Sequence, residues 1–277
     1  MSSDVKALGG LPAADQTQLP APPLELAVAE VRFVGAAATA LEPAVGLRLR
    51  EVMNEAGLSV TGMERAQQNV VSFDINATGE AQQRVENHQV GWQYADAERS
   101  ASVTILGASI AVQAARYERW SVTMAPLIEA ALAAVDEVMS PQVTDRVGLR
   151  YIDRFVDPSA QSPGAWVGRI HHDLIGPVSH PVFGDRLTAA QQQLELRLEP
   201  ECGALIRHGA FQDAQAGGRF SYLLDIDTFD ERKVAFDPRD IVDRAQALNR
   251  TALSLFQASL TDEYLRELKT REGGLGA

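Results

Sequence analysis

Cysteine is nearly absent from this sequence, since Cys202 is the only one among 277 residues. A single thiol excludes any disulfide within the chain and any zinc site built from several cysteines. Cys202 lies in the segment EPECGALI, which is typical of a turn between strands, and free cysteines are usually small buried residues. We therefore expect Cys202 to have a structural role and not to act as a nucleophile.

Basic residues are also few, because 25 lysines and arginines stand against 37 acidic residues and leave a formal net charge of −12. A chain of this sign repels phosphate backbones and anionic lipids, so we expect neither a nucleic acid nor a membrane as its partner. No apolar run approaches the roughly 18 residues that a membrane helix needs. The N-terminus lacks the charged start and apolar stretch of a signal peptide, so we expect a cytoplasmic protein.

The motifs of common catalytic and cofactor sites are missing as well. The sequence has no Gly-x-Ser-x-Gly elbow and no glycine pattern of the Walker or Rossmann type. His171 and His172 are adjacent, and on a helix they would diverge by about 100°, which keeps two imidazoles from one ion. We expect no metal and no cofactor, and we interpret His171, His172 and Asp173 as a solvated helix end.

What the sequence does contain is an order of predicted elements that occurs twice. Alternating apolar residues predict strands, and apolar residues three and four apart predict helices. In the first half, strands are predicted at 24–34, 69–75, 90–96 and 102–117, the last interrupted at Gly107, with helices at 43–57 and 123–139. In the second half, strands are predicted at 147–156, 188–200, 204–212 and 219–229, with helices at 162–176, 237–260 and from Thr261.

Both halves therefore run strand, helix, three strands, long helix. Their leading strands align with an offset of 118 residues, which places Glu30-Val31-Arg32-Phe33 against Gly148-Leu149-Arg150-Tyr151. This order predicts an α+β fold made by tandem duplication, with a mostly antiparallel sheet packed on helices. The predicted modules are 24–140 and 141–272, and a pocket is expected at the seam between them. Residues 1–23 and 273–277 are expected to be a disordered leader and tail.

Four segments carry a resemblance to a known family. PPLELAVAEVRF, DRVGLRYIDRF, LLDIDTF and LNRTALSLFQASLTDEYLREL resemble, in that order, the recurring segments of a sporadically distributed family of uncharacterised bacterial proteins. The resemblance spans nearly all of the chain that is expected to be ordered. It implies a bacterial protein but no particular activity. Members often carry a histidine in the last long helix where this chain has Asn249 or Arg250.

Arg150 is the most unusual residue of the predicted strands, because it interrupts an otherwise apolar run. Asp225 and Asp227 are two residues apart in a predicted strand and so share one face. Together these side chains can bind a polar ligand or transfer protons. The alternative is a buried ion-pair network that joins the two repeats. Arg32 is the counterpart of Arg150 in the first half, and with Glu30 it lies either near the seam or on an exposed edge.

Aromatic residues gather around the strands of the first half, at Trp92, Tyr94, Tyr117 and Trp120. They fit either a ligand cavity or the hydrophobic core, since each ring buries a large apolar area. Trp92 and Tyr117 are the candidates for ligand contact, beside Arg32, Arg150, Asp225 and Asp227.

Two functions remain open from the sequence. The first is a bacterial cytosolic binding or partner-recognition protein without catalytic activity. The alternative is an enzyme or sensor for a small molecule that uses the arginine and aspartate cluster in a cavity between the modules. An open pocket with an unpaired acid of raised pKa would favour the second function. The expected partner is a protein or a small molecule, and a homodimer is left open.

Overall fold

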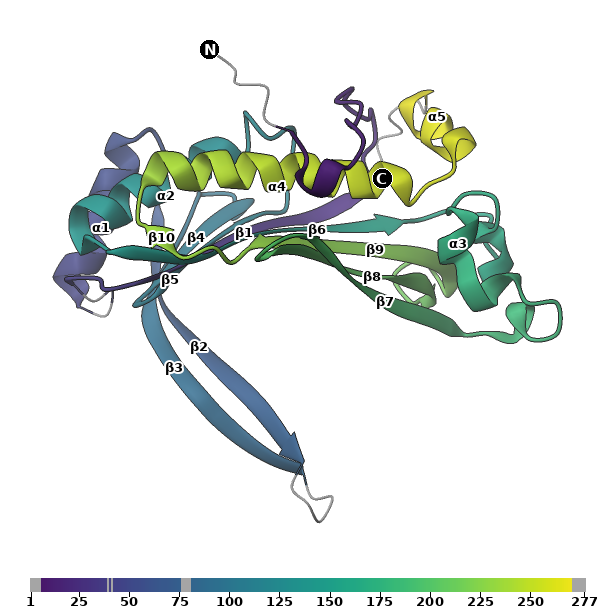
Figure 1. The fold of residues 1–277 in the computed structure, drawn as a ribbon, viewed down its shortest axis with the longest axis horizontal. Coiled ribbons are helices and arrows are strands. Elements are labelled where there is room, and N and C mark those ends of the chain that lie inside the picture. Colours follow the sequence, from purple (N-terminus) through teal and green to yellow (C-terminus); the bar gives the residue numbers. More distant parts are fainter. Residues whose placement is uncertain (1–5, 39, 41, 76–80, 271–277) are drawn as a thin grey trace.

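The computed structural model describes residues 6–38, 40, 42–75 and 81–270, with the side chains of 67–89 excepted. One antiparallel sheet of ten strands runs through the molecule, and helices cover one of its faces (Figure 1). Its strands are β1 (Leu24–Val34), β2 (Gly62–Ile75), β3 (Ala81–Ala95), β4 (Ala101–Leu106), β5 (Ser109–Ala114), β6 (Val143–Phe155), β7 (Ala189–Glu199), β8 (Cys202–Asp213), β9 (Arg219–Asp230) and β10 (Val234–Ala235). The predicted α+β class is thereby confirmed.

The order of the strands shows the duplication directly. The sheet runs β2-β3-β4-β5-β1-β6-β9-β8-β7, and β10 pairs with β6 beside this path. Strands β5, β4 and β3 extend outward from β1 as β9, β8 and β7 extend outward from β6. The two leading strands meet at the centre, where Glu30 pairs with Gly148, the residue 118 positions further along. A two-fold relation between the halves therefore passes through this pair.

The first half has four strands after its first helix, one more than in the predicted order of strand, helix, three strands, long helix. Residues 102–117 form two strands, β4 and β5, which turn at Gly107 as the sequence suggests. Strand β2 has no counterpart in the second half and is longer than the predicted strand 69–75. It pairs with β3 from Gly62 to Ile75, whereas β4 pairs only with Gly91–Ala95 of β3. The remaining length of β2 and β3 projects from the sheet as a two-stranded arm (Figure 1).

The helices follow the predicted apolar stripes and caps, with one exception. They are α1 (Pro43–Glu55), α2 (Met124–Met139), α3 (His172–Ile175), α4 (Pro238–Ala258) and α5 (Asp262–Thr270). Asp237 caps α4, since its side chain accepts a hydrogen bond of 2.9 Å from the Arg239 backbone N–H. The exception is the predicted helix 162–176, which is wrong: this segment is a 3-10 turn at Pro163–Trp166 and the single helical turn α3. None of the described helices has the length and apolar composition needed to cross a bilayer.

Two hydrophobic clusters form the core, one for each half of the sheet. The first lies between β1, β3–β5, α1 and α2, and the second includes Phe155, Trp166 and Tyr222. Helix α4 belongs to both clusters. Its N-terminal half places Ile241 and Leu248 in the first cluster, while its C-terminal half contributes to the second. The two predicted modules are therefore halves of one sheet and share a helix.

The chain before β1 is ordered from Lys6 onward, so the prediction of a disordered leader is wrong for residues 6–23. Its backbone follows α4 (Figure 1): the Leu8 N–H donates to Thr251 Oγ1 at 2.9 Å, and Ser254 Oγ donates to the Pro12 carbonyl at 2.9 Å. Asp15 forms an ion pair of 2.6 Å with Lys269 of α5. The predicted tail 273–277 and residues 1–5 lie outside the described residues.

Candidate functional site

A cleft of about 530 Å³ opens on the helix-covered face of the sheet, at the seam between the halves. We call it the central cleft. Strands β6 and β9 form its floor, α4 forms one wall, and the segment before β1 and the turn after β5 form the rest. Its lining includes Leu19, Leu24, Tyr117, Trp120, Tyr151, Asp153, Ile226, Gln246, Asn249, Arg250, Leu253 and Phe256. The expectation of a pocket at the seam is confirmed.

Among the acids that line the cleft, Asp153 has the pKa that departs most from its ordinary value. It lies in β6, two residues after Tyr151 and therefore on the same face of the sheet, and it is only 4% exposed. The structure gives its carboxyl neither a hydrogen bond nor an ion pair with any described residue. Burial raises the pKa of Asp153 to about 8, and the charge of Asp225 behind the sheet adds to this increase. At pH 7 the group is therefore mostly a neutral carboxylic acid.

A chain of hydrogen bonds joins three side chains beside Asp153. The Tyr151 hydroxyl donates to Asn249 Oδ1 at 2.9 Å, and it lies 3.4 Å from the Tyr117 hydroxyl. The two tyrosine rings meet edge to face, with centroids 5.7 Å apart. Burial raises the pKa of both tyrosines above its ordinary value, so both hydroxyls stay protonated near neutral pH.

Arg250 brings a positive charge into the cleft wall. It lies on α4, one residue after Asn249 and in line with Gln246 and Leu253 at helical spacing. Its Nε atom is buried and has no hydrogen-bond partner. No carboxylate of the described residues forms an ion pair with it. Asp153 and Arg250 thus line the same cleft as a carboxylic acid and a cation that are not paired with each other.

The predicted arginine and aspartate cluster lies on the other face of the sheet. Arg150 donates two hydrogen bonds to Asp225, from Nε to Oδ1 and from Nη2 to Oδ2, both of 2.7 Å. Arg207 of β8 approaches the same carboxylate at 3.4 Å. Asp225 is buried and its charge is matched by these arginines. Arg150 and Asp225 therefore do not line the central cleft, and they form the ion-pair network across the strands that was the alternative interpretation.

Asp227 belongs to the same network and not to the cleft. Arg146 links it to the first half, with 3.5 Å from Nη2 to Asp227 and 2.9 Å from Nη1 to Glu30. Burial raises the pKa of Asp227 despite these arginines. Arg32 lies on this face as well, about half exposed, and contacts Glu30 at 3.1 Å. The polar face thus joins β1, β6 and β9 through side chains from both halves.

The two aromatic candidates separate in the structure. Tyr117 lines the central cleft, as predicted for a ligand contact residue. Trp92 does not line it and is buried in the first hydrophobic cluster, where its ring lies 4.2 Å from the Arg65 guanidinium. Gly46 of α1 leaves the space that the indole fills, because a Cβ atom at that position would lie 2.5 Å from Trp92 Nε1. Core packing is therefore the role of Trp92.

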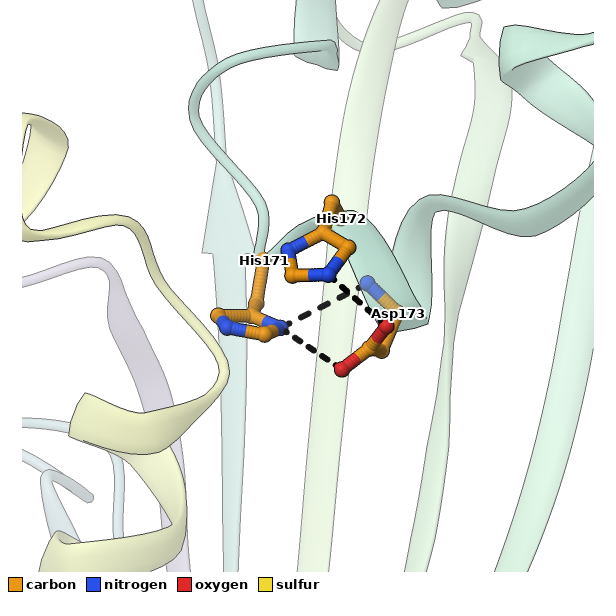
Figure 2. A group of neighbouring side chains, drawn as sticks. All are labelled: His171, His172 and Asp173. Carbon is orange, nitrogen blue, oxygen red and sulfur yellow. Dashed lines mark hydrogen bonds and ion pairs between the residues drawn. The ribbon is translucent and has the colours of Figure 1, made fainter.

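The segment His171, His172 and Asp173 forms a second polar cluster, shown in Figure 2. The spacing argument against a shared ion is wrong here, because His171 precedes α3 with an extended backbone and its ring folds back. One ligand atom from each residue lies within 4.8 Å of the others. However, His171 Nδ1 already accepts the Asp173 backbone N–H at 3.4 Å and so caps the helix. The side chains are largely exposed, and capping accounts for their arrangement.

Asp153 and Arg250 are the site residues that the sequence reasoning missed. Asp153 follows Val147, Leu149 and Tyr151 in steps of two, so the alternation that predicts an inward Tyr151 also predicts an inward Asp153. An acidic residue at a strand position that alternation assigns to the buried face is the sequence signal that could have identified Asp153.

Comparisons with known proteins add no functional assignment. No family model matches the chain, and no curated protein matches it. Among solved structures, the S. pombe Pct1 RNA triphosphatase in complex with the Spt5 CTD aligns at 8% identity, over 90% of this chain and 87% of that chain, with a TM-score of 0.11. A TM-score of this size shows no common fold. The structure itself defines the class: a duplicated α+β sheet protein with a cleft at its seam.

Proposed function

We propose that this protein binds a small molecule in the central cleft. The observation that carries the proposal is Asp153, a carboxyl that is 4% exposed, borders a cleft and has no partner among the described residues. Buried polar groups in folded proteins are nearly always hydrogen-bonded. Leaving one without a partner costs on the order of 1–3 kcal/mol. A ligand that fills the cleft supplies that partner.

The size and lining of the cleft support the same proposal. Ligand pockets for small organic molecules measure about 300–1,000 Å³ and combine apolar walls with a few polar groups. The cleft, at about 530 Å³, falls inside this range. Its apolar and aromatic side chains surround the polar atoms of Asp153, Asn249 and Arg250. This composition favours a small molecule over a flat protein contact, while a protein partner, a homodimer and a cytoplasmic location stay predictions from the sequence.

Catalysis in the same cleft is the second candidate function, and Asp153 favours it specifically. A carboxyl with a pKa of about 8 holds its proton at neutral pH and can give it to a bound substrate. Ionised acids of ordinary pKa cannot serve as that donor. The residue that would carry the chemistry is therefore Asp153, and not Asp225, whose carboxylate is occupied by Arg150.

Native mass spectrometry of the purified protein tests the proposed binding. We expect a bound small molecule on the wild-type chain, and we expect Leu253→Trp, which fills the cleft, to abolish it. Val182→Trp is the matched control, because Val182 is 65% exposed and does not line the cleft. A metabolite collection is then screened by thermal melts. If no compound binds the wild type, and none raises the melting temperature of the wild type more than that of Leu253→Trp, the proposal is wrong.

A further inference from the structure

The charge inside the central cleft is positive near neutral pH. Arg250 contributes a guanidinium that has no acidic partner among the described residues. The other polar groups of the interior are neutral: the two tyrosines, Asn249 and the protonated Asp153. The charged residues that remain in the lining stand at the exposed rim, and they are Asp15, Glu118, Arg119 and Asp243.

From this arrangement we propose that the central cleft is selective for an amphiphilic monocarboxylate, with the carboxylate on Arg250 and the apolar body against the aromatic wall. The inference rests on the proposed function, since it names the class of ligand for that site. A guanidinium binds a carboxylate through two parallel N–H bonds, and the unpartnered Nε of Arg250 is one of the donors this needs. One cation without an acidic partner matches one negative charge, which favours a carboxylate over a doubly charged phosphate.

The walls beside Arg250 fit the apolar part of such a molecule. Tyr117 and Trp120 face the cleft from the turn after β5, while Leu253 and Phe256 lie one and two turns further along α4. Ile226 of β9 contributes to the floor. Aromatic rings in such a wall bury large areas and stack on planar or acyl groups. The anionic end and the apolar end of the ligand thus have separate places in one cleft.

Asp153 makes this site sensitive to pH. As a neutral acid it donates a hydrogen bond to a ligand oxygen, and as a carboxylate it repels a ligand anion. It ionises with a pKa of about 8. The other charged lining groups are Arg250 and, at the rim, Asp15, Glu118, Arg119 and Asp243. Burial raises the pKa of Tyr117 and Tyr151, so both stay neutral between pH 6.5 and 9, and the lining contains no histidine, cysteine or lysine. Affinity for the anion should therefore fall as the pH rises through this range.

Isothermal titration calorimetry at pH 7 tests the charge preference with three probes that share a naphthyl group and differ in the charge of the end group. They are 2-naphthylacetic acid, 2-(2-naphthyl)ethanol and 2-(2-naphthyl)ethylamine. We expect the acid to bind about tenfold more tightly than the alcohol, which corresponds to one charge-assisted contact. Arg250→Ala should remove this advantage, so that the acid and the alcohol bind with similar affinity. Arg32→Ala is the matched control, because Arg32 lies on the opposite face of the sheet and should change neither affinity.

A pH series with Asp153→Asn tests the second part. The wild-type affinity for 2-naphthylacetic acid should fall by about tenfold from pH 6.5 to 9, whereas the Asn variant, which keeps a neutral donor, should show no such fall. 2-Naphthyl phosphate serves as a fourth probe. The monocarboxylate inference would be overturned, and a binding cleft upheld, if the amine or the phosphate bound more tightly than the acid, or if acid and alcohol bound equally. Absence of binding by every probe, together with no ligand on the native protein, would overturn both the inference and the proposed function.

Discussion

Arg150 and Asp225 form a two-point contact between β6 and β9, with both N–H donors 2.7 Å from a carboxylate oxygen. Asp225 is buried while the Arg150 side chain is 42% exposed, so a guanidinium that stays partly in solvent neutralises a buried carboxylate. The pair stands on the face of the sheet that the helices leave uncovered. It therefore stabilises the join between strands without reaching the central cleft.

Removal of Arg150 should destabilise the protein measurably. Arg150→Ala leaves the buried Asp225 carboxylate with only the longer contact to Arg207, and we expect a loss of about 2 kcal/mol in the free energy of unfolding. Urea denaturation measures this change. Arg32→Ala is the control, since an exposed ion pair contributes less than about 1 kcal/mol. Equal unfolding midpoints for the two variants would show that the Arg150 contact has no structural role.

Asp153 should make the stability depend on pH in a direction unusual for an acid. Its pKa is about 8 in the folded state and about 3.9 in the unfolded chain, so the folded state binds more protons between these values. Stability is therefore lost as the pH rises, by about 1.4 kcal/mol per pH unit from this group. Urea denaturation of the wild type and Asp153→Asn at pH 5, 6 and 7 isolates the effect, because other titrating groups cancel in the difference. A difference that stays constant with pH would show that Asp153 is ionised in the fold.

The hydrogen bonds of Tyr151 offer a matched pair of variants. Tyr151→Phe removes the 2.9 Å bond to Asn249 and should cost about 1 kcal/mol. Tyr117→Phe removes only the 3.4 Å contact between the hydroxyls, and we expect a clearly smaller loss. Chemical denaturation of both variants at the same pH compares their free energies of unfolding. Should Tyr117→Phe be the more harmful change, the Tyr117 hydroxyl must have a stronger partner than Tyr151.

The segment before β1 should be needed for the cleft but not for the sheet. It forms one wall of the cleft, and it is held by side-chain hydrogen bonds to α4, the Asp15–Lys269 ion pair and three leucines, Leu8, Leu11 and Leu19, at the margins of the hydrophobic clusters. A chain that lacks residues 1–19 should keep its far-ultraviolet circular dichroism spectrum while its affinity for 2-naphthylacetic acid falls. Unchanged affinity in the truncated chain would exclude this segment as part of the binding site.

Much of the fold could be predicted from the sequence, because the signals are local. Alternation identified the central strands, and the Asp237-Pro238 cap located the start of α4. The arm formed by β2 and β3 was predicted too short, since the added stretches 62–68 and 81–89 are rich in polar residues and lack the apolar alternation in sequence that predicts a strand. The prediction of a helix at 162–176 was wrong because the tertiary fold pairs these residues otherwise: Val167 forms a β-bridge with Ile170, and Ile170 forms a second one with Leu260.

The candidate site was predicted only in part, because strand faces were assigned without knowing which face the helices cover. Asp225 and Asp227 do share a face with Arg150, as the period of two requires. That face turned out to be the uncovered one. Asp153 lies on the other face, and the knowledge that α4 leaves an opening there comes from three-dimensional packing and not from the period of the strand.

Helix α4 has a consequence for how the protein is made. Ile241, Ala245 and Leu248 complete the hydrophobic cluster of the first half, although about a hundred residues separate them from the last strand and helix of that half. During synthesis, part of the apolar surface of the first half therefore stays uncovered until α4 has emerged from the ribosome. A first half that ended at residue 140 would therefore lack this part of its interior, whereas in an isolated second half Ile241, Ala245 and Leu248 would have no cluster to cover.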